Sequence, residues 1–192
     1  LEPQRHGEAR PVPELIEVEM YRTALDAAVG RCIAEVVTVD PLMVRGDIDR
    51  SVLDAALVGS RIERTDRRGK LAVCHLDSGH ALGLRFGMTG RLIVGHNAPI
   101  EHLEYGAKRD DPRWDRLVLR LDNDTLVRIN DPRRLGSFEL DPAVDRLGAD
   151  ATTISAAAFR DALDSQRALK AILLDQARLA GLGNLLVDEI LW

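Results

Sequence analysis

The chain has 192 residues, of which 45% are hydrophobic and 30% are charged, so it is long enough to bury the core of one or two domains. Its formal net charge is −5, which argues against a protein that coats nucleic acid nonspecifically, because that mode of binding needs clustered Lys and Arg side chains. Residues 1–11 are too polar for a signal peptide, and no apolar run reaches the roughly 18 residues of a membrane span, so we expect a cytoplasmic protein without a membrane partner.

The first part of the chain alternates between helical and strand patterns. Residues 1–12 carry no hydrophobic periodicity, and we expect them to form a disordered lead-in. Pro13 stands where a helix can begin, and an apolar stripe that ends at Gly30 predicts a helix over residues 14–29. The pattern that follows predicts a short helix at 50–58 and strands at 33–39, 61–67, 70–76, 81–86 and 91–94.

The middle of the chain continues the strand-rich pattern after a long loop. Residues 97–111 are polar and lack periodicity, which predicts a surface loop. Alternating leucines then predict strands at 117–121 and 126–129, joined by a turn at Asn123 and Asp124. An antiparallel block of this kind with helices against it predicts an α+β fold, whose first domain, over residues 13–148, is a β-sandwich with flanking helices.

Beyond residue 148 the pattern becomes helical and predicts a second domain over residues 149–192. Ser155 can cap a helix at 156–163, a further helix is expected at 169–176, and Asn184 is a good N-cap for the last one. The last helical pattern is still strong at Trp192, so we expect an incomplete second domain in a chain that is a fragment.

Five motifs stand in the order and approximate spacing of one protein family: PELIEVE at 13–19, RRGK at 67–70, FGMTG at 86–90, DPRRLG at 131–136 and LLDQARLAGLGN at 173–184. Through them the chain resembles the formamidopyrimidine-DNA glycosylase and endonuclease VIII family over residues 13–192. The resemblance implies a β-sandwich domain, then a helix-two-turns-helix DNA-binding domain that is incomplete at 149–192, then a zinc finger that these residues do not contain.

The resemblance also sets expectations for partners and cofactors. It implies damaged double-stranded DNA as the partner of a monomeric protein, and structural zinc only in the missing C-terminal segment. Within this chain we expect no cofactor and no metal site, because Cys32 and Cys74 lack nearby partners at the spacing of metal ligands.

The first motif carries residues suited to base removal. Displacing a base from C1′ of deoxyribose is easier when a nucleophile attacks that carbon while an acid stabilises the opening sugar. A proline at a free N-terminus supplies a secondary amine with a pKa of about 8, which is far less protonated at neutral pH than a lysine. In the family this proline matches Pro13, the general acid or proton shuttle matches Glu14, and a supporting carboxylate matches Glu17. Without the resemblance, Pro13 and Glu14 are explained as residues that start a helix.

Pro13 is internal in this chain, and an amide nitrogen is not a nucleophile. We therefore hypothesise that Val12 corresponds to a GTG start codon, which is read as Met and then removed, so that the mature protein begins at Pro13. A mature protein that retains residues 1–12 would reject this mechanism.

Lys70 follows Arg67, Arg68 and Gly69, and it matches a family lysine that contacts the DNA phosphate near the lesion and assists the chemistry. Between residues 61 and 70 there are five basic and two acidic residues, so a basic stripe can exist on an acidic protein. The alternative is an ordinary cluster of solvated charges.

Met88, Arg133 and Leu135 resemble the residues with which the family fills the space that an extruded base leaves in the DNA stack. Arg134 belongs to the same motif, and we expect it to contact DNA. Phenylalanine is more usual than leucine at position 135, and leucine stacks poorly on a neighbouring base. The alternative is that Met88 and Leu135 are core residues beside turns.

Lys170 and Asn184 match family residues that bind the DNA backbone, and Gln176 lies between them in the sequence. Gly181 and Gly183 would let a phosphate approach the main chain near Asn184. A capped helix after a glycine turn explains this pattern equally well.

The function that these observations favour is a bifunctional DNA glycosylase and abasic-site lyase of base excision repair, acting on oxidised purines such as 8-oxoguanine and formamidopyrimidines. Oxidised pyrimidines remain open as substrates. One alternative is a catalytically silent DNA-binding paralogue or fragment of the same family, and another is a structural protein that merely shares these turns.

Overall fold

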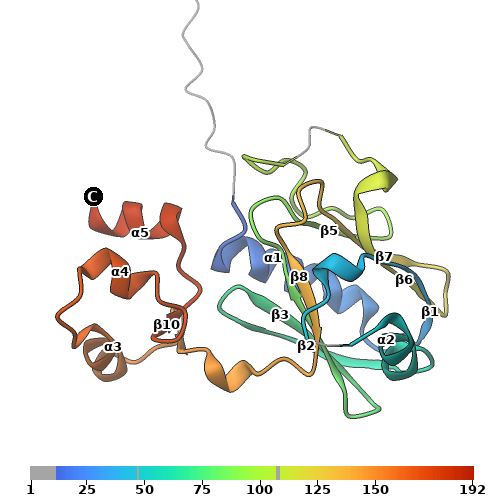
Figure 1. Ribbon diagram of the computed structural model, residues 1–192, viewed down its shortest axis with the longest axis horizontal. Coiled ribbons are helices and arrows are strands. Elements are labelled where there is room, and N and C mark those ends of the chain that lie inside the picture. Colours follow the sequence, from blue (N-terminus) through green and yellow to red (C-terminus); the bar gives the residue numbers. More distant parts are fainter. Residues whose placement is uncertain (1–11, 47, 107–108) are drawn as a thin grey trace, which may run out of the picture.

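The computed structural model describes residues 12–46, 48–106 and 109–192, and Figure 1 shows their arrangement. The predicted lead-in therefore lies outside the described residues except for Val12. A group of two sheets occupies one side of the molecule, and a group of helices at 149–192, called the helical block below, occupies the other.

Two antiparallel four-stranded sheets form the sandwich, as the sequence predicted. The first sheet has the strand order β1 (Ile33–Val39), β6 (Asp115–Leu121), β7 (Leu126–Asn130) and β5 (Arg91–Val94). The second has the order β2 (Ile62–Arg68), β3 (Leu71–Leu76), β4 (Ala81–Arg85) and β8 (Ser137–Leu140). Strand β8 was not predicted: its four residues, SFEL, alternate between polar and apolar side chains, but the run is short and follows an arginine-rich turn directly.

One core of buried aliphatic side chains fills the sandwich, in keeping with the low aromatic content of 4%. Helix α1 (Leu15–Leu25) packs against β2, β3 and β5, and a short 3-10 helix (Asp26–Ala28) continues it, so the predicted helix at 14–29 is confirmed with a changed final turn. Its Tyr21 ring lies 4.4 Å from the Phe86 ring, centroid to centroid, and the Tyr21 hydroxyl donates to the Gly90 carbonyl. Helix α1 is thereby fixed to the turn that follows β4.

The other elements of the sandwich are short. Helix α2 (Arg50–Leu57) packs against β1 and is capped by the Asp49 side chain, which accepts from the Val52 N–H. Three further 3-10 helices lie at Pro41–Met43, Pro112–Trp114 and Val144–Arg146. The described part of the predicted loop at 97–111 holds no helix or strand element.

The helical block contains α3 (Ala156–Leu163), α4 (Leu169–Leu173), α5 (Asn184–Leu191) and two short parallel strands, β9 (Ala149–Asp150) and β10 (Leu179–Ala180). Ser155 caps α3 as predicted, by accepting from the Ala158 N–H. Leu15 of α1 packs into the small core of this block together with Leu173, Leu179, Leu182 and Val187. The first turn of α1 therefore joins the block to the sandwich.

Two predictions about the helical block were wrong. Helix α4 ends at Leu173 rather than at residue 176, because the Gln176 amide is engaged by the following turn: it donates to the Leu182 carbonyl and accepts from the Gly181 N–H. Gly183, not Asn184, is the N-cap of α5, and Asn184 is the first helical residue. Within the described residues, no helix has both the length and the apolar character needed to cross a membrane.

Candidate functional site

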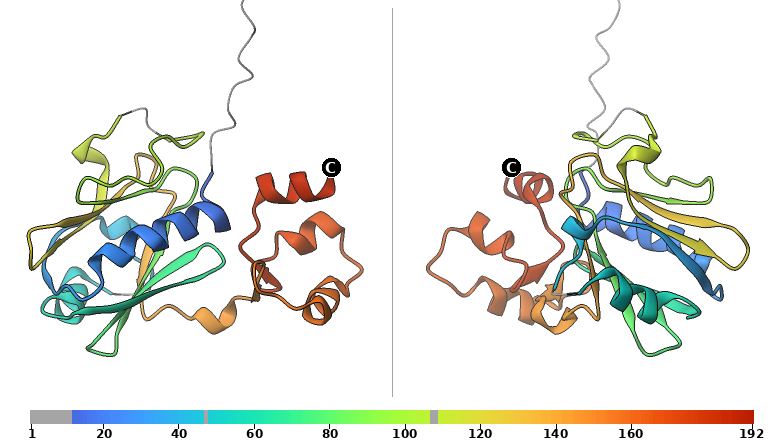
Figure 2. Two further views of the ribbon diagram at one scale, coloured as in Figure 1. Left: turned by 180° about the vertical axis from the view of Figure 1, so that it is seen from behind. Right: turned by 45° about the vertical axis from the view of Figure 1, so that its right-hand side comes forward.

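A cleft of about 950 Å³ lies between the sandwich and the helical block. It brings together six of the residues that the sequence singled out: Pro13, Glu14, Lys70, Met88, Leu135 and Asn184. The turn between β2 and β3 reaches toward the helical block, as Figure 2 shows, and carries Lys70 to this place.

Glu14 is the N-cap of α1, and its side chain is only 3% exposed. Its carboxylate accepts from three main-chain N–H groups at the start of α5: those of Gly183 at 2.8 Å, Leu185 at 3.0 Å and Leu186 at 3.2 Å. These donors lack partners inside their own helix, and the helix dipole favours a carboxylate there. A residue of the sandwich thus supplies the cap that the sequence assigned to Asn184.

Glu17 supports Glu14 through the main chain. One oxygen of its carboxylate accepts from the Glu14 N–H at 2.9 Å. Glu17 is half-buried and lies in the first turn of α1. Its side chain supports the main chain of Glu14, and its part in the chemistry stays a prediction.

Lys70 faces Glu14 across Gly183. A Cβ atom at Gly183 would lie 2.2 Å from Oε1 of Glu14 and 2.5 Å from Nζ of Lys70, so only glycine fits between the two side chains. Partial burial lowers the pKa of Lys70, and the carboxylates of Glu14 and Glu17 oppose that shift. Lys70 is therefore a partly buried cation in the cleft wall that faces a carboxylate, and its role stays a prediction.

Two of the five basic residues considered for a stripe at 61–70 are paired with acids of the protein. Arg67 is 8% exposed and pairs with Glu19 and Asp150, while Arg64 pairs with Asp66. Lys70 is the basic residue of this segment that lines the cleft.

Pro13 is buried in the wall of the cleft, directly before Glu14. In this chain its nitrogen is acylated by Val12, which also lines the cleft. The nitrogen at this position is therefore in the same cleft as Lys70, but it is not an amine while Val12 is attached.

Met88 and Leu135 are each 41% exposed, so the alternative that they are core residues is wrong. Their two turns are in direct contact, because a Cβ atom at Gly87 would lie 2.4 Å from the carbonyl oxygen of Leu135. Two apolar side chains thus project from a rigid pair of turns into the cleft.

The Asp131 carboxylate connects the turn that carries Met88 to the turn that carries Leu135. Its carboxylate is fully buried and accepts from the Thr89 hydroxyl at 2.5 Å and from the N–H groups of Arg133, Leu135 and Gly136 at 2.8–3.1 Å. Thr89 belongs to one turn and the other donors belong to the second. One buried carboxylate therefore fixes the relative position of Met88 and Leu135.

Arg133 and Arg134 are exposed beside the cleft and do not line it in the described part of the chain. Nε of Arg134 lies 2.5 Å from Oδ2 of Asp40, so its charge is already paired within the protein. Lys170 is likewise exposed, and its ammonium pairs with Asp188 of α5. Asp188 lines the cleft, so Lys170 reaches the cleft only through this acidic neighbour.

Several residues of the cleft wall were not predicted: Arg45, Arg85, Glu104, Tyr105, Ser137 and Asp188. They come from five separate segments of the chain, and no sequence motif marks any of them. Arg85 is paired with Glu139 at 3.0 Å, whereas Tyr105 is 53% exposed. Among residues 12–46, 48–106 and 109–192, no three His, Cys, Asp or Glu side chains lie together in a way that could hold a metal ion.

Comparisons with known proteins connect this geometry to one family. Residues 12–138 match the family described as "Formamidopyrimidine-DNA glycosylase N-terminal domain". The chain is 35% identical over 191 residues to the formamidopyrimidine-DNA glycosylase of Heliobacterium modesticaldum and 31% identical over 197 residues to that of Mycobacterium leprae. In both cases 94% of the chain is covered, and the chain spans 66% of the length of the relative.

Solved structures show the same similarity. One is a complex of Lactococcus lactis Fpg with DNA that contains an abasic site, with a TM-score of 0.73 and 27% identity. Another is the wild-type Lactococcus lactis Fpg with DNA that contains N7-benzyl-Fapy-dG, with a TM-score of 0.75 and 29% identity. The chain is covered over 93% and 94% of its length, and it spans 66% of each of those proteins.

Proposed function

Because the chain belongs to the formamidopyrimidine-DNA glycosylase family, as its match over residues 12–138 shows, we propose that it is a DNA glycosylase of base excision repair that also cleaves abasic sites. Its substrates in this proposal are oxidised purines, such as 8-oxoguanine and formamidopyrimidines, in double-stranded DNA. The observation that carries the proposal is the cleft that holds Pro13, Glu14 and Lys70 together with Met88 and Leu135.

Pro13 is the proposed nucleophile, once Val12 has been removed. Its secondary amine attacks C1′ of the extruded nucleotide, and the bond from C1′ to the base breaks as the base leaves with the bonding electrons and takes up a proton. Loss of the amine proton and opening of the sugar ring give an iminium between Pro13 and C1′. The iminium acidifies C2′, so removal of a C2′ proton expels the 3′ phosphate and cuts the strand.

Glu14 and Lys70 are the proposed acid-base and phosphate-binding groups. The three N–H donors of α5 fix the Glu14 carboxylate beside Pro13, which suits a group that gives a proton to the opening sugar. Lys70 presents a compact ammonium that can bind one phosphate oxygen. Burial has removed part of the water around this ammonium and lowers its pKa. A bound phosphate would replace the lost water contacts.

Met88 and Leu135 are proposed to occupy the gap that the extruded base leaves. Both are apolar, both are exposed in the cleft, and the Asp131 carboxylate holds their turns in place. Arg133 and Asn184 are proposed to contact the DNA backbone. For Arg134 and Lys170, contact with DNA requires that their ion pairs with Asp40 and Asp188 open or rearrange.

The test is borohydride trapping with an oligonucleotide duplex that contains an abasic site. Two forms of the protein are compared, one that begins at Pro13 and one that retains Val12 with an acetylated N-terminus. We expect a covalent adduct with the first form and none with the second. A folded protein that begins at Pro13, binds the duplex and gives no adduct would overturn the proposal.

A second candidate function is DNA binding without excision. The acylated nitrogen of Pro13 favours this function, because the cleft and its apolar side chains do not depend on a free amine. Intact mass of the natively expressed protein separates the two, since a mature N-terminus at Pro13 supports the enzyme and retention of Val12 supports the silent binder.

Zinc, oligomeric state and compartment complete the proposal. We propose, from the family alone, that structural zinc is held by a C-terminal segment that these residues do not contain. We further propose a cytoplasmic monomer, in which one cleft takes one lesion.

A further inference from the structure

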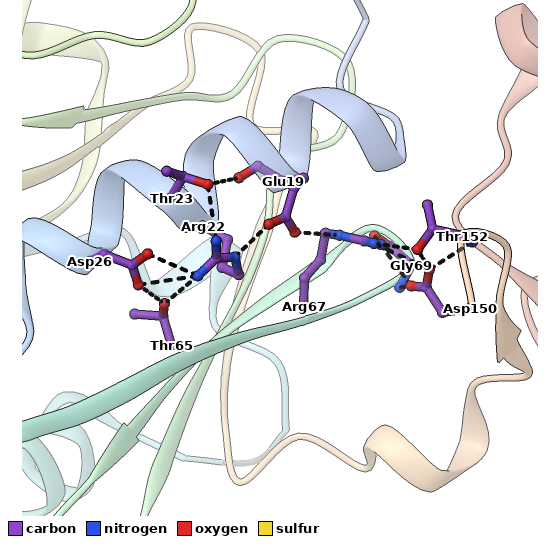
Figure 3. A network of polar contacts seen from close by, with 9 residues as sticks. All are labelled: Glu19, Arg22, Thr23, Asp26, Thr65, Arg67, Gly69, Asp150 and Thr152. Carbon is purple, nitrogen blue, oxygen red and sulfur yellow. Dashed lines mark hydrogen bonds and ion pairs between the residues drawn. The ribbon is translucent and has the colours of Figure 1, made fainter.

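Arg67 of β2 and Asp150 of β9 form a buried ion pair between the sandwich and the helical block (Figure 3). Nη1 of Arg67 lies 2.7 Å from Oδ2 of Asp150, and Nη2 lies 3.1 Å from Oδ1, so the pair is bidentate. The side chains are only 8% and 6% exposed. No sequence motif that points to catalysis includes Asp150.

The pair also holds the main chain of Gly69, the residue before Lys70. Oδ2 of Asp150 accepts from the Gly69 N–H at 2.7 Å, and Nη1 of Arg67 donates to the Gly69 carbonyl at 2.8 Å. Gly69 has a φ of +57°, and a Cβ atom there would lie 2.7 Å from Cβ of Ala180 in the helical block. Both main-chain groups of Gly69, its N–H and its carbonyl, are therefore hydrogen-bonded to this ion pair.

Arg67 extends the contact to a third element. Its Nε donates to Oε2 of Glu19 at 2.9 Å, and Glu19 lies on α1, the helix whose first turn carries Glu14 and Glu17. Figure 3 shows the Arg67 side chain lying between Glu19 and Asp150. One guanidinium thus connects α1, the Lys70 turn and the helical block.

We propose that Arg67 and Asp150 are positioning residues that set the place of Lys70 relative to Glu14. This inference rests on the proposed function. The helical block holds Glu14 through the N–H groups at the start of α5, and it holds the Lys70 turn through Asp150. The same part of the protein therefore positions both groups. The two side chains then face each other across Gly183 only while the block is docked.

Stability alone does not require an ion pair here. Replacing a buried ion pair by apolar residues of similar volume is often neutral or stabilising, because removing two charges from water is costly. An apolar pair could fill the same space, but it could neither accept from the Gly69 N–H nor donate to the Gly69 carbonyl. An apolar replacement of the pair is therefore expected to leave the protein folded and to slow the reaction.

The test uses the protein with Pro13 at its N-terminus and compares the parent with an R67M/D150L double variant. A matched control is R128M/D115L, which replaces another bidentate, largely buried pair that lies within one sheet and away from the cleft. Three quantities are measured: the melting temperature, the affinity for a duplex with an abasic-site analogue, and the single-turnover rate of borohydride-trapped adduct formation.

We expect R67M/D150L to melt within a few degrees of the parent, to bind the duplex within about threefold, and to form adduct at least about 30 times more slowly, because small misplacements cost large factors in rate. The control should keep the parental rate. A parental rate in a folded R67M/D150L variant would overturn the inference. An unmodified parent that gives no adduct would instead overturn the proposed function, and this inference with it.

A second variant keeps the test decisive if the double variant does not fold. R67K retains the buried positive charge, but one ammonium cannot reach Asp150, Glu19 and the Gly69 carbonyl together. We expect R67K to fold and to lose at least about 10-fold in adduct rate with an unchanged affinity. An R67K variant at the parental rate would show that the guanidinium geometry does not position Lys70.

Discussion

Glu14 illustrates how one side chain can serve both the fold and the proposed chemistry. Its carboxylate lines the cleft, and it is also the acceptor for the first N–H groups of α5. Any substitution of Glu14 therefore changes the helix cap and the cleft at once. A substitution of Gly183, which lies between Glu14 and Lys70, disturbs the cleft without removing the Glu14 carboxylate.

The substitution Gly183→Ala is predicted to lower adduct formation by about 100-fold, because the new methyl group must displace Glu14 or Lys70 and a shift of about 1 Å is that costly. Gly79→Ala is the matched control. Gly79 has a φ of +86° with open space around it, so its replacement costs about 1 kcal/mol of stability without touching the cleft. Equal adduct rates for the two variants would contradict the prediction.

Met88→Ala and Leu135→Ala are each predicted to weaken binding to a duplex with an abasic-site analogue by about 10-fold, since burying a Met or Leu side chain is worth roughly 1.5–3 kcal/mol. Both residues are exposed, so the melting temperature should change little. Leu42→Ala serves as a control, because Leu42 is 81% exposed and lies outside the cleft. Affinities equal to that of the Leu42 variant would show that these side chains do not contact DNA.

At the scale of elements, the two turns after β4 and β7 form one unit around the Asp131 carboxylate. The substitution Asp131→Asn keeps the volume but replaces one acceptor oxygen with an amide group that faces N–H donors. We expect a loss of about 2 kcal/mol in the free energy of unfolding, together with weaker DNA binding, because hydrogen bonds to a buried charge are strong.

The control for this prediction is Asp141→Asn. Asp141 is exposed and directly follows β8, and its carboxylate accepts from the Ala81 N–H at the start of β4. This substitution should cost less than about 1 kcal/mol. Urea unfolding and fluorescence anisotropy with labelled duplex measure the two quantities. If Asp131→Asn destabilises the protein without affecting DNA affinity, the turns are not the DNA-contacting unit.

At the scale of the whole molecule, the buried contact between the sandwich and the helical block should respond to acid. Burial would raise the pKa of Asp150, but hydrogen bonds from Arg67, Thr152 and Gly69 outweigh it and lower the pKa to about 2. An unfolded aspartate has a pKa of about 3.9, so this stabilisation is complete above that value and is lost as the pH falls toward 2.

The prediction is that Asp150→Asn destabilises the protein most at neutral pH, and that the difference from the parent shrinks as the pH is lowered from about 5 to about 2.5. Urea unfolding at several pH values measures it. A difference that stays constant over this range would show that the Asp150 carboxylate does not contribute in the way its contacts indicate.

Sequence patterns predicted most of the sandwich because its strands are largely apolar runs that end at turn residues, so that local preference and burial agree. They missed β8 and the true end of α4, since only two of the four β8 residues are apolar and the Gln176 amide is bound by a turn downstream. The carboxylate that caps α5 could not be predicted from the sequence for another reason. Its acceptor, Glu14, is 169 residues away from Gly183.

The candidate site shows the same division. Motifs indicated Pro13, Glu14, Lys70, Met88 and Leu135, and the fold brings them to one cleft. The partners of Arg134 and Lys170 are acids from distant segments, so no local pattern could have indicated that these cations are already paired. Arg67 and Asp150 are 83 residues apart in the sequence, so no local pattern could have indicated that they form a pair.

The capping of α5 by Glu14 has a consequence for synthesis of the protein. The last of the three donors, the Leu186 N–H, lies 172 residues after Glu14. At translation speeds of about 5–20 residues per second, roughly 10 to 35 s separate the two during elongation. On the proposed function, a nascent polypeptide carries its future nucleophile and lysine long before it can orient them, and the cleft is complete only when α5 has left the ribosome.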